Sequence, residues 1–274
     1  MNQTNSVIAT LGVPMSNLLE SKTVVILGLA NKWSIAHSIG EAFRREGAKL
    51  VITFQGERQR ETVDELAREL EAVRVVNCDV TKDEELAHLA ESLKDLAPIS
   101  AIVHSIAFAN REDLSRPFVE TSREGYQLAQ DVSSYSLVAV ARTLVPLMTE
   151  GGSIMTLSYL GGVRVMPNYN VMGVAKAALE ACVKYLAYDL GGKNIRVNAI
   201  SAGPIKTTSA RGVRDFSKML EAAAEASPLK RSTDPAEVAD TAVFLASHLG
   251  RGVTGNVIYV DAGYQIMGKL GPAA

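Results

Sequence analysis

Tyr159, Tyr169 and Lys176 are the side chains best suited to donate or organise protons in the middle of this sequence. Tyr169 stands seven positions before Lys176, and in a helix seven residues make nearly two turns. Both side chains would then leave one helix face about 10 Å apart along its axis, too far for a direct ion pair. A ligand lying along that face suits the spacing, with Lys176 on a cofactor ribose and Tyr169 on the reacting group. Taken alone, the spacing is explained more simply by one buried tyrosine and one solvated lysine.

A second group of residues, from Gly28 to Ala36, has the composition of a phosphate-binding turn. It follows an apolar run and leads into a segment of helical periodicity, so backbone N–H groups and the positive end of a helix would face a pyrophosphate. Gly28 permits the tight turn, while Ser34 and Ala36 allow close approach and offer hydroxyl and amide donors. Only the first glycine of GxGxxG is clearly retained, so on spacing alone a βα turn without a ligand stays open.

Gln55 ends the second apolar run, about where a dinucleotide-binding fold keeps its ribose-recognising acid. Its amide can hydrogen-bond a ribose hydroxyl without adding charge. Glu57 would repel a ribose 2′-phosphate, whereas Arg58 and Arg60 would attract one. The pattern favours NADH over NADPH.

Asp79 and Val80 follow the third apolar run. A carboxylate at Asp79 can accept a hydrogen bond from the adenine amino group, while Val80 packs on the ring. A helix cap ahead of Asp83 explains Asp79 equally well.

The elements that must position these residues alternate between short β-branched runs and longer segments of helical periodicity, which predicts a parallel sheet covered by helices. We therefore predict one α/β, doubly wound, Rossmann-type domain with a seven-stranded parallel sheet and helices on both faces. It would span residues 21–274, after an N-terminal arm of residues 1–20, with the packed fold beginning near Lys22. The expected strands are 23–27, 49–54, 74–76, 101–104, 153–157, 196–200 and 257–260. The expected helices are 35–46, 58–71, 83–96, 123–148, 170–190 and 235–247.

The helix around Val174–Val183 carries small or apolar residues around most of its circumference. Such a helix is typically buried on more than one side. Packing within the domain accounts for one face, and we expect a subunit contact on another. A fully internal helix is the alternative.

Composition excludes several classes of function. The 274 residues are 47% apolar, enough for one sizeable core, and the 28 basic and 30 acidic residues give a net charge of −2, which argues against nucleic-acid binding. Cys78 and Cys182 stand far apart without metal-ligand spacing, so we expect neither a disulfide nor a metal site, and a reducing, cytoplasmic compartment. Residues 1–21 contain no Lys or Arg and no apolar run long enough to span a membrane, so we expect neither a signal peptide nor membrane association.

Taken together and in order, these residues closely resemble the NADH-dependent bacterial enoyl-[acyl-carrier-protein] reductases. That family is the divergent branch of the short-chain dehydrogenases that works in type II fatty-acid synthesis. The resemblance covers about Leu18 to Gly268. It is carried by Gly28 with Ser34-Ile35-Ala36, His104-Ser105-Ile106-Ala107-Phe108-Ala109, Tyr159, Tyr169 with Lys176, Gly203-Pro204-Ile205-Lys206-Thr207 and Asp261-Ala262-Gly263.

The resemblance implies that NADH reduces the trans-2 double bond of an enoyl thioester by hydride transfer to the β-carbon. Tyr169 would donate a hydrogen bond to the thioester oxygen as enolate charge develops. Lys176 would hold the nicotinamide ribose and help organise the proton supply. Tyr159 would be a second proton donor and a wall of the pocket. Acyl carrier protein would deliver the substrate to a homotetramer.

Met172 separates this reading from a general short-chain dehydrogenase, which places its catalytic tyrosine four residues before the lysine. The shifted Tyr169 suits C=C reduction better than C=O reduction. A ketoreductase is therefore the weaker alternative. A non-catalytic dinucleotide-binding regulator is weaker too, because a sensor has no need of Tyr159, Tyr169 and Lys176 together.

The resemblance also places further residues on cofactor and substrate. The cofactor set is Gly28, Ser34, Ile35, Gln55, Asp79, Val80, Ser105, Ile106, Lys176, Ile205, Lys206, Thr207, Thr208 and Ser209, and the substrate set is Ala109, Tyr159, Tyr169, Phe216 and Met219.

Residues 204–228 would form a substrate lid, a loop leading into a short amphipathic helix. Phe216, Met219 and Leu220 give that helix one apolar face to roof an acyl channel. A fixed surface helix is the alternative. Four basic residues outnumber Asp215 in this stretch: Lys206, Arg211, Arg214 and Lys218. They would attract an acidic carrier protein. The alternative is that these side chains are merely solvated.

Overall fold

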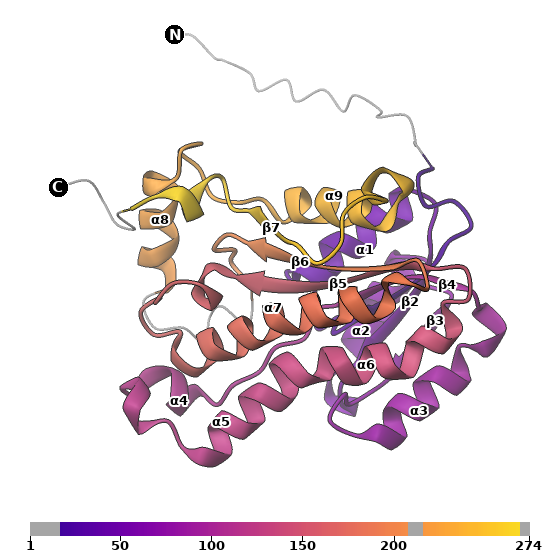
Figure 1. Ribbon diagram of the computed structural model, residues 1–274, viewed down its shortest axis with the longest axis horizontal. Coiled ribbons are helices and arrows are strands. Elements are labelled where there is room, and N and C mark those ends of the chain that lie inside the picture. The colour runs from indigo at the N-terminus through magenta and orange to yellow at the C-terminus, as the bar shows by residue number, and fades with distance from the viewer. Residues whose placement is uncertain (1–16, 208–215, 269–274) are drawn as a thin grey trace, which may run out of the picture.

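Seven parallel strands form one sheet in the order β3-β2-β1-β4-β5-β6-β7 in the computed structural model, which describes residues 17–207 and 216–268 (Figure 1). Strand order reverses between β1 and β4, the arrangement of a doubly wound fold. The strands are β1 Thr23–Leu27, β2 Lys49–Phe54, β3 Arg74–Asn77, β4 Ile99–His104, β5 Gly152–Tyr159, β6 Ile195–Ala202 and β7 Val257–Val260.

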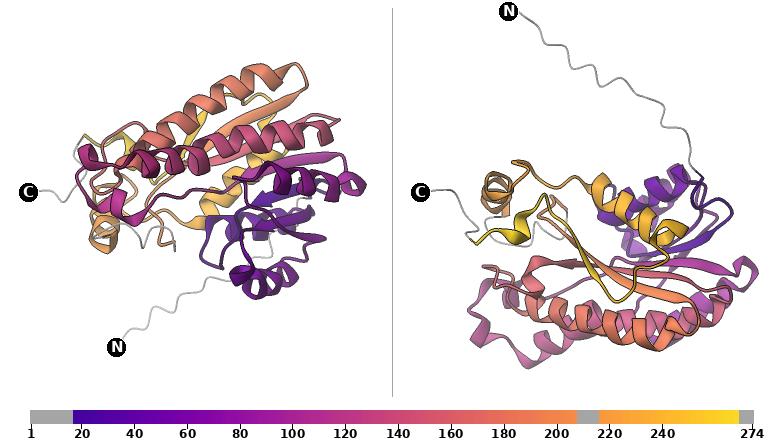
Figure 2. Two further views of the ribbon diagram at one scale, coloured as in Figure 1. Left: turned by 90° about the horizontal axis from the view of Figure 1, so that it is seen from below. Right: turned by 45° about the horizontal axis from the view of Figure 1, so that its top comes forward.

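Helices cover both faces of this sheet (Figure 2). One face carries α1 Ile35–Arg45, α2 Arg60–Glu69 and α9 Pro235–Ala246, and the other carries α3 Asp83–Ser92, α6 Ser136–Leu144 and α7 Asn170–Gly191. Toward the carboxyl ends of the strands lie α4 Arg111–Ser115, α5 Arg123–Gln130 and α8 Phe216–Ala226 (Figure 1).

Two hydrophobic layers follow from the alternation of side chains along each strand. In β1, Val24 and Ile26 pack into the layer beneath α1, α2 and α9, whereas Val25 and Leu27 pack into the layer beneath α3, α6 and α7. All five residues of β1 are buried, as expected for a parallel strand covered on both faces. The predicted Rossmann-type architecture is confirmed.

The helix predicted for residues 123–148 is wrong as a single continuous α-helix. A π-helical segment, Asp131–Tyr135, separates α5 from α6. Within it, the Ser133 hydroxyl both accepts from the backbone N–H of Phe108 and donates to its carbonyl, at 2.9 Å each. Ser136 bonds the carbonyl of Val132 at 2.6 Å. These contacts compete with the regular helical ladder, and such bulges recur at functional sites.

The packed structure includes residues on the amino-terminal side of Lys22. Leu19 is 1% exposed in the layer beneath α1, and its N–H donates to the carbonyl of Glu46. Part of the segment assigned to the arm therefore belongs to the core, because an apolar side chain at this position fills the end of that layer.

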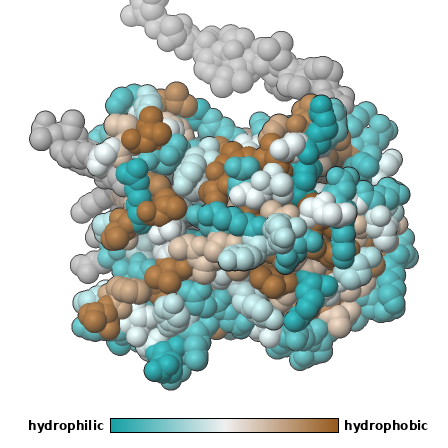
Figure 3. Space-filling view, viewed as in Figure 1, coloured by the Kyte–Doolittle hydropathy of each residue, from teal (hydrophilic) through white to brown (hydrophobic). Residues whose placement is uncertain are grey.

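The face of the molecule shown in Figure 3 is mixed in character, with hydrophobic and hydrophilic residues interspersed. None of the described helices combines the length and apolarity needed to cross a membrane. Within the same residues no three side chains of His, Cys, Asp or Glu gather as metal ligands.

Candidate active site

The turn after β1 packs directly against the end of β4. Gly28 has φ +90°, and a Cβ atom there would lie 2.4 Å from the carbonyl oxygen of Ser105 and 3.0 Å from Cγ1 of Ile106. Only glycine fits this backbone and this approach. The structure thus brings Gly28 together with Ser105 and Ile106 at the point where strand order reverses, the usual place for a bound dinucleotide.

The start of α1 faces this point with its helix end free for an anion. Ser34 is the N-cap: its hydroxyl accepts from the N–H of His37 at 3.2 Å and donates to the carbonyl of Asn31 at 2.7 Å. No acidic side chain occupies the first turn, which begins at Ile35. The positive helix end is therefore not neutralised locally, and it fits a pyrophosphate.

Gln55 and Asp79 lie together after β2 and β3. Burial opposes ionisation of Asp79, but hydrogen bonds from Thr81 and from the Gln55 side chain outweigh it, so the pKa of Asp79 falls below its usual value. The Asp79 carboxylate bonds the N–H and hydroxyl of Thr81 at 3.0 and 2.7 Å. Asp79 therefore caps the turn at Thr81, and its Oδ2 lies 3.9 Å from Nζ of Lys82. Val80 beside it is buried.

The charged side chains that follow Gln55 are paired in a way the sequence did not reveal. Arg60 forms an ion pair with Glu57 at 2.7 Å, and its guanidinium lies 5.2 Å from the centre of the Phe54 ring. Arg60 is thereby held away from the role of phosphate ligand. Arg58 makes no ion pair with any residue the structure describes.

Tyr159 and Tyr169 meet at the carboxyl end of β5. Tyr159 ends the strand and Tyr169 immediately precedes α7, and their rings stand edge to face with centroids 4.9 Å apart and planes at 67°. Gly161 makes this contact possible, since a Cβ atom there would lie 2.4 Å from Cδ1 of Tyr169. The sequence analysis missed this role of Gly161, although its place two residues after Tyr159 was a signal.

Both tyrosine hydroxyls are protonated donors at neutral pH. Burial, followed by the neighbouring Tyr264, raises the pKa of Tyr159 above its usual value. Burial, followed by Tyr159 and Glu180, raises the pKa of Tyr169 likewise. The Tyr159 hydroxyl oxygen is buried and bonds no described group, the arrangement expected of a group that binds a ligand.

Lys176 is 5% exposed and fixed to the end of β5, with its Nζ donating to the carbonyl of Leu157 at 2.7 Å. Burial lowers the pKa of Lys176 to about 8, although the charge of Glu180 opposes that shift. An ammonium has three donors, so two remain for a cofactor or substrate. The alternative of a solvated lysine is wrong here.

His104 contributes no charge to this site. Its Nδ1 lies 2.9 Å from the Thr156 hydroxyl and its Nε2 lies 2.8 Å from the Ser136 hydroxyl. Burial and the charge of Lys176 lower the pKa of His104 to about 3. A neutral, fully bonded imidazole ties β4 to β5 and α6.

Asn170 ties Tyr169 to the loop after β4, a role that sequence analysis missed. Its amide nitrogen donates to the carbonyls of Leu114 and Arg116 at 3.2 and 2.7 Å. Both Asn168 and Asn170 adopt positive φ, 61° and 41°. Asparagine tolerates this conformation, and two in this short run were the available signal.

The residues predicted to bind substrate lie in the loop after β4 and in α8. Ala109 is half-buried in that loop. Met219 of α8 packs on a cluster that also contacts Tyr159 and Tyr169, formed by Leu160, Met166, Ala223 and Tyr264. The short helix predicted within residues 204–228 is confirmed as α8.

The segment predicted to contact the cofactor at the start of the lid follows β6. Ile205 is 7% exposed and its carbonyl accepts from the N–H of Thr207 at 2.8 Å, while Lys206 is exposed. Several lid assignments lie outside the described residues: Thr208, Ser209, Arg211, Arg214 and Asp215, together with the side chains of Phe216 and Lys218.

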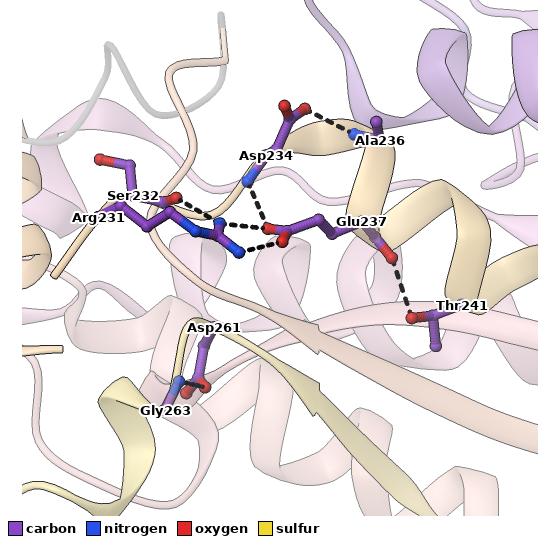
Figure 4. A network of polar contacts seen from close by, with 8 residues as sticks. All are labelled: Arg231, Ser232, Asp234, Ala236, Glu237, Thr241, Asp261 and Gly263. Carbon is purple, nitrogen blue, oxygen red and sulfur yellow. Dashed lines mark hydrogen bonds and ion pairs between the residues drawn. The ribbon is translucent and has the colours of Figure 1, made fainter. Parts of the chain in front are cut away.

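A polar network at the start of α9 follows the predicted lid, residues 204–228 (Figure 4). Asp234 caps the helix by accepting from the N–H of Ala236 at 2.9 Å, and Glu237 accepts from the N–H of Asp234 at 2.9 Å and from Arg231. This capping box fixes where the lid rejoins the body.

Gly203, at the near end, lies against Thr233 and Asp261, since a Cβ atom there would lie 2.1 Å from the Thr233 hydroxyl and 3.0 Å from Cα of Asp261. Asp261 in turn accepts from the N–H of Gly263 at 3.0 Å (Figure 4). Both ends of the lid therefore meet the same small region of the body.

Comparisons with known proteins agree with this geometry. A sequence model of the family described as "Enoyl-(Acyl carrier protein) reductase" matches residues 28–265. The chain is 57% identical to the enoyl-[acyl-carrier-protein] reductase [NADH] FabI of Bacillus cereus, over 92% of this chain and 99% of the relative. It is 53% identical to the corresponding [NADPH] enzyme of Staphylococcus aureus, over 90% and 97%. The crystal structure of the Bacillus cereus reductase with NADP+ and indole naphthyridinone superposes with a TM-score of 0.90 at 56% identity, covering 92% of this chain and 99% of that one.

Proposed function

This chain belongs to the enoyl-[acyl-carrier-protein] reductase family, and we propose that Tyr159, Tyr169 and Lys176 carry out its reaction. The reaction is the NADH-dependent reduction of the trans-2 double bond of an enoyl thioester in fatty-acid synthesis. One observation supports the assignment above the others. The two tyrosine rings lie 4.9 Å apart at the end of β5, while Lys176 is bound to the same strand end.

Tyr169 stabilises the negative charge that develops on the thioester oxygen. Its raised pKa keeps the hydroxyl protonated, so it can donate a hydrogen bond to that oxygen. Such a preorganised donor contributes about 3 kcal/mol to transition-state stabilisation. When bound, NADH supplies the hydride that reduces the β-carbon.

Lys176 and Tyr159 complete the polar wall of the site. The Lys176 ammonium keeps two donors for a ribose hydroxyl, and its charge favours the enolate held by Tyr169. The unpartnered Tyr159 hydroxyl is a second candidate proton donor toward the substrate. Met172, 7% exposed, fills the position where a ketoreductase would carry its tyrosine.

The nucleotide is held by the carboxyl ends of β1 to β4 and β6. Gly28, Ser34 and Ile35 form the pyrophosphate turn, and Ser105 and Ile106 pack beside it. The remaining assigned contacts are Gln55 on the ribose, Asp79 and Val80 on the adenine, and Ile205 to Ser209 around the nicotinamide. The Glu57–Arg60 pair supports a preference for NADH.

We further propose that the chain assembles as a homotetramer. On α7, Ala177 and Ala181 are exposed beside Tyr185 and Tyr188, which are 76% and 86% exposed, so the alternative of a fully internal helix is wrong. Their spacing places them on one helix face, and exposed apolar faces of this kind mark protein contacts. Sedimentation at micromolar concentration tests this: a monomer throughout would refute it.

Acyl carrier protein presents the thioester, and we propose that it docks on the basic lid. Lys206 is exposed at the near end of that segment. Reversing the charges of Arg211 and Arg214 should raise KM for carrier-bound substrate. An unaltered KM would refute the docking site.

We place the protein in the cytoplasm, in keeping with the free thiols of Cys78 and Cys182, and we propose neither nucleic-acid nor membrane partners.

The decisive assay follows NADH oxidation with crotonyl thioester and with acetoacetyl thioester. We expect oxidation with the first and not with the second. Preference for acetoacetyl thioester would identify a ketoreductase. Nucleotide binding without turnover of either substrate would identify a regulator.

A further inference from the structure

We infer that Glu180 is a positioning residue for this reaction, holding Lys176 charged and fixing the strand end that carries Tyr159. The inference rests on the roles proposed above for those two residues. Glu180 belongs to α7, one helical turn beyond Lys176, and is 6% exposed.

Two adjacent contacts fasten α7 to the end of β5. Lys176 Nζ donates to the carbonyl of Leu157 at 2.7 Å, and the hydroxyl of Ser158 donates to Oε1 of Glu180 at 2.5 Å. Leu157 and Ser158 are consecutive and lead directly into Tyr159. The helix bearing Lys176 and the strand bearing Tyr159 are therefore held in register at the site itself.

The turn after β5 closes over the same carboxylate. A Cβ atom on Gly162 would lie 3.1 Å from Oε1 of Glu180 and 3.2 Å from the backbone nitrogen of Ala177. Removing a carboxylate from water costs free energy unless the charge interacts with an opposite charge or with hydrogen-bond donors. A neutral side chain could join the helix to the strand without this desolvation cost. The charge of Glu180 therefore requires a role beyond packing.

The Ser158 contact has the length of a hydrogen bond from a hydroxyl to an ionised carboxylate. Burial raises the pKa of Glu180 above its usual value, and the hydrogen bond from Ser158 and the charges of Lys184 and Lys176 offset only part of that rise. Charged and titratable groups face it from three elements: Lys176 and Lys184 on α7, Tyr169 just before it, and Tyr259 on β7.

The consequence of this charge lies in the titration of Lys176. Burial lowers the pKa of Lys176, and Glu180 opposes that shift, leaving a value of about 8. His104, which faces Lys176 from β4, is neutral and adds no competing charge. Without the negative charge of Glu180, Lys176 would lose its proton at a lower pH and cease to favour the enolate.

Glu180→Gln separates charge from shape, because the amide oxygen still accepts from Ser158. We expect the basic limb of the kcat/KM profile for crotonyl thioester to move down by about one pH unit. Lys176 itself is followed by the Cε resonance of 13C-labelled lysine in the full chain, assigned by its loss in Lys176→Met. The pH midpoint of the titration of this resonance should fall by the same amount, whether or not the enzyme turns over.

Three variants control the result. Glu65→Gln removes a negative charge from an exposed position on α2 and should move neither midpoint. Ser158→Ala keeps the carboxylate and removes the hydrogen bond, so it should lower kcat at every pH while leaving the limb in place. Glu180→Asp keeps the charge and should hold the Lys176 midpoint near the wild-type value even if Glu180→Gln folds poorly.

An unmoved Lys176 resonance in Glu180→Gln, or an equal shift in Glu65→Gln, would overturn the role of Glu180. Absence of crotonyl thioester turnover in the wild type would instead overturn the proposed function. The resonance still reports on Glu180 in that case, so the two failures are distinguishable.

Discussion

Gly161→Ala should disable the site without removing any functional group. The added Cβ atom would lie 2.4 Å from Cδ1 and 2.7 Å from Cε1 of Tyr169, and 3.3 Å from Cδ1 of Tyr159. The backbone of Gly161 does not adopt positive φ, so alanine is strained there only by this contact. The substitution therefore acts on the position of the Tyr169 ring.

The size of the effect follows from the displacement. Ordinary van der Waals contact begins at 3.4 Å, so the ring must move by about 1 Å from its place 2.4 Å from the new atom. A misplacement of about 1 Å lowers catalysis by roughly 100-fold, or about 2.7 kcal/mol in the barrier. We expect the loss in kcat rather than in KM for NADH, because the nucleotide turn at Gly28 is untouched.

Steady-state NADH oxidation with crotonyl thioester measures this effect, and Gly191→Ala is the matched control. A Cβ atom on Gly191, the last residue of α7, meets nothing within 4 Å, so activity should be unchanged there. A double-mutant cycle with Tyr169→Phe decides the mechanism. If Gly161→Ala acts by misplacing the Tyr169 hydroxyl, it should have little further effect once that hydroxyl is gone. Full additivity of the two losses would refute the reasoning.

Four further variants test separate parts of the site. Tyr169→Phe should lower kcat by about 100-fold with little change in KM, and unchanged turnover would remove Tyr169 from the mechanism. Glu57→Gln should raise the NADPH to NADH ratio of kcat/KM by about tenfold, because it removes a repelling charge and frees Arg60; an unchanged ratio would contradict the proposed ribose site. Lys176 has a pKa of about 8 in the folded chain against an ordinary 10.5, so between these values the unfolded chain binds more protons and stability rises with pH. Chemical denaturation at a series of pH values measures this effect. From about pH 8 to 10.5 the free energy of unfolding should rise by about 3 kcal/mol more in the wild type than in Lys176→Met. An equal dependence of stability on pH in the two proteins would contradict the burial of a charged lysine. Lys176→Ala should also weaken NADH binding, which fluorescence titration measures.

The sheet and the glycine turn after β1 were predictable because their signals are local. β-branched runs mark each strand, and Gly28 stands where the chain turns with positive φ between strand and helix. The spacing of Tyr169 and Lys176 likewise follows from helix geometry. These features depend on residues that are close together in the sequence.

The remaining features arise from contacts between distant residues. Ser158 and Glu180 are 22 residues apart, and Ser133 interrupts a helix by bonding Phe108, 25 residues away. Nothing in either residue's local sequence indicates its partner. The burial of Lys176 was unpredictable for the same reason, since it depends on how α7 packs against β5.

The central claim is that this site delivers hydride to the β-carbon of an enoyl thioester. The most direct test reduces crotonyl thioester with NADH carrying deuterium at the transferred position, and locates the label in the product by NMR. We expect butyryl thioester with one deuterium at the β-carbon and a solvent-derived proton at the α-carbon. Deuterium at the α-carbon, or no reduced product while acetoacetyl thioester is consumed, would contradict the claim.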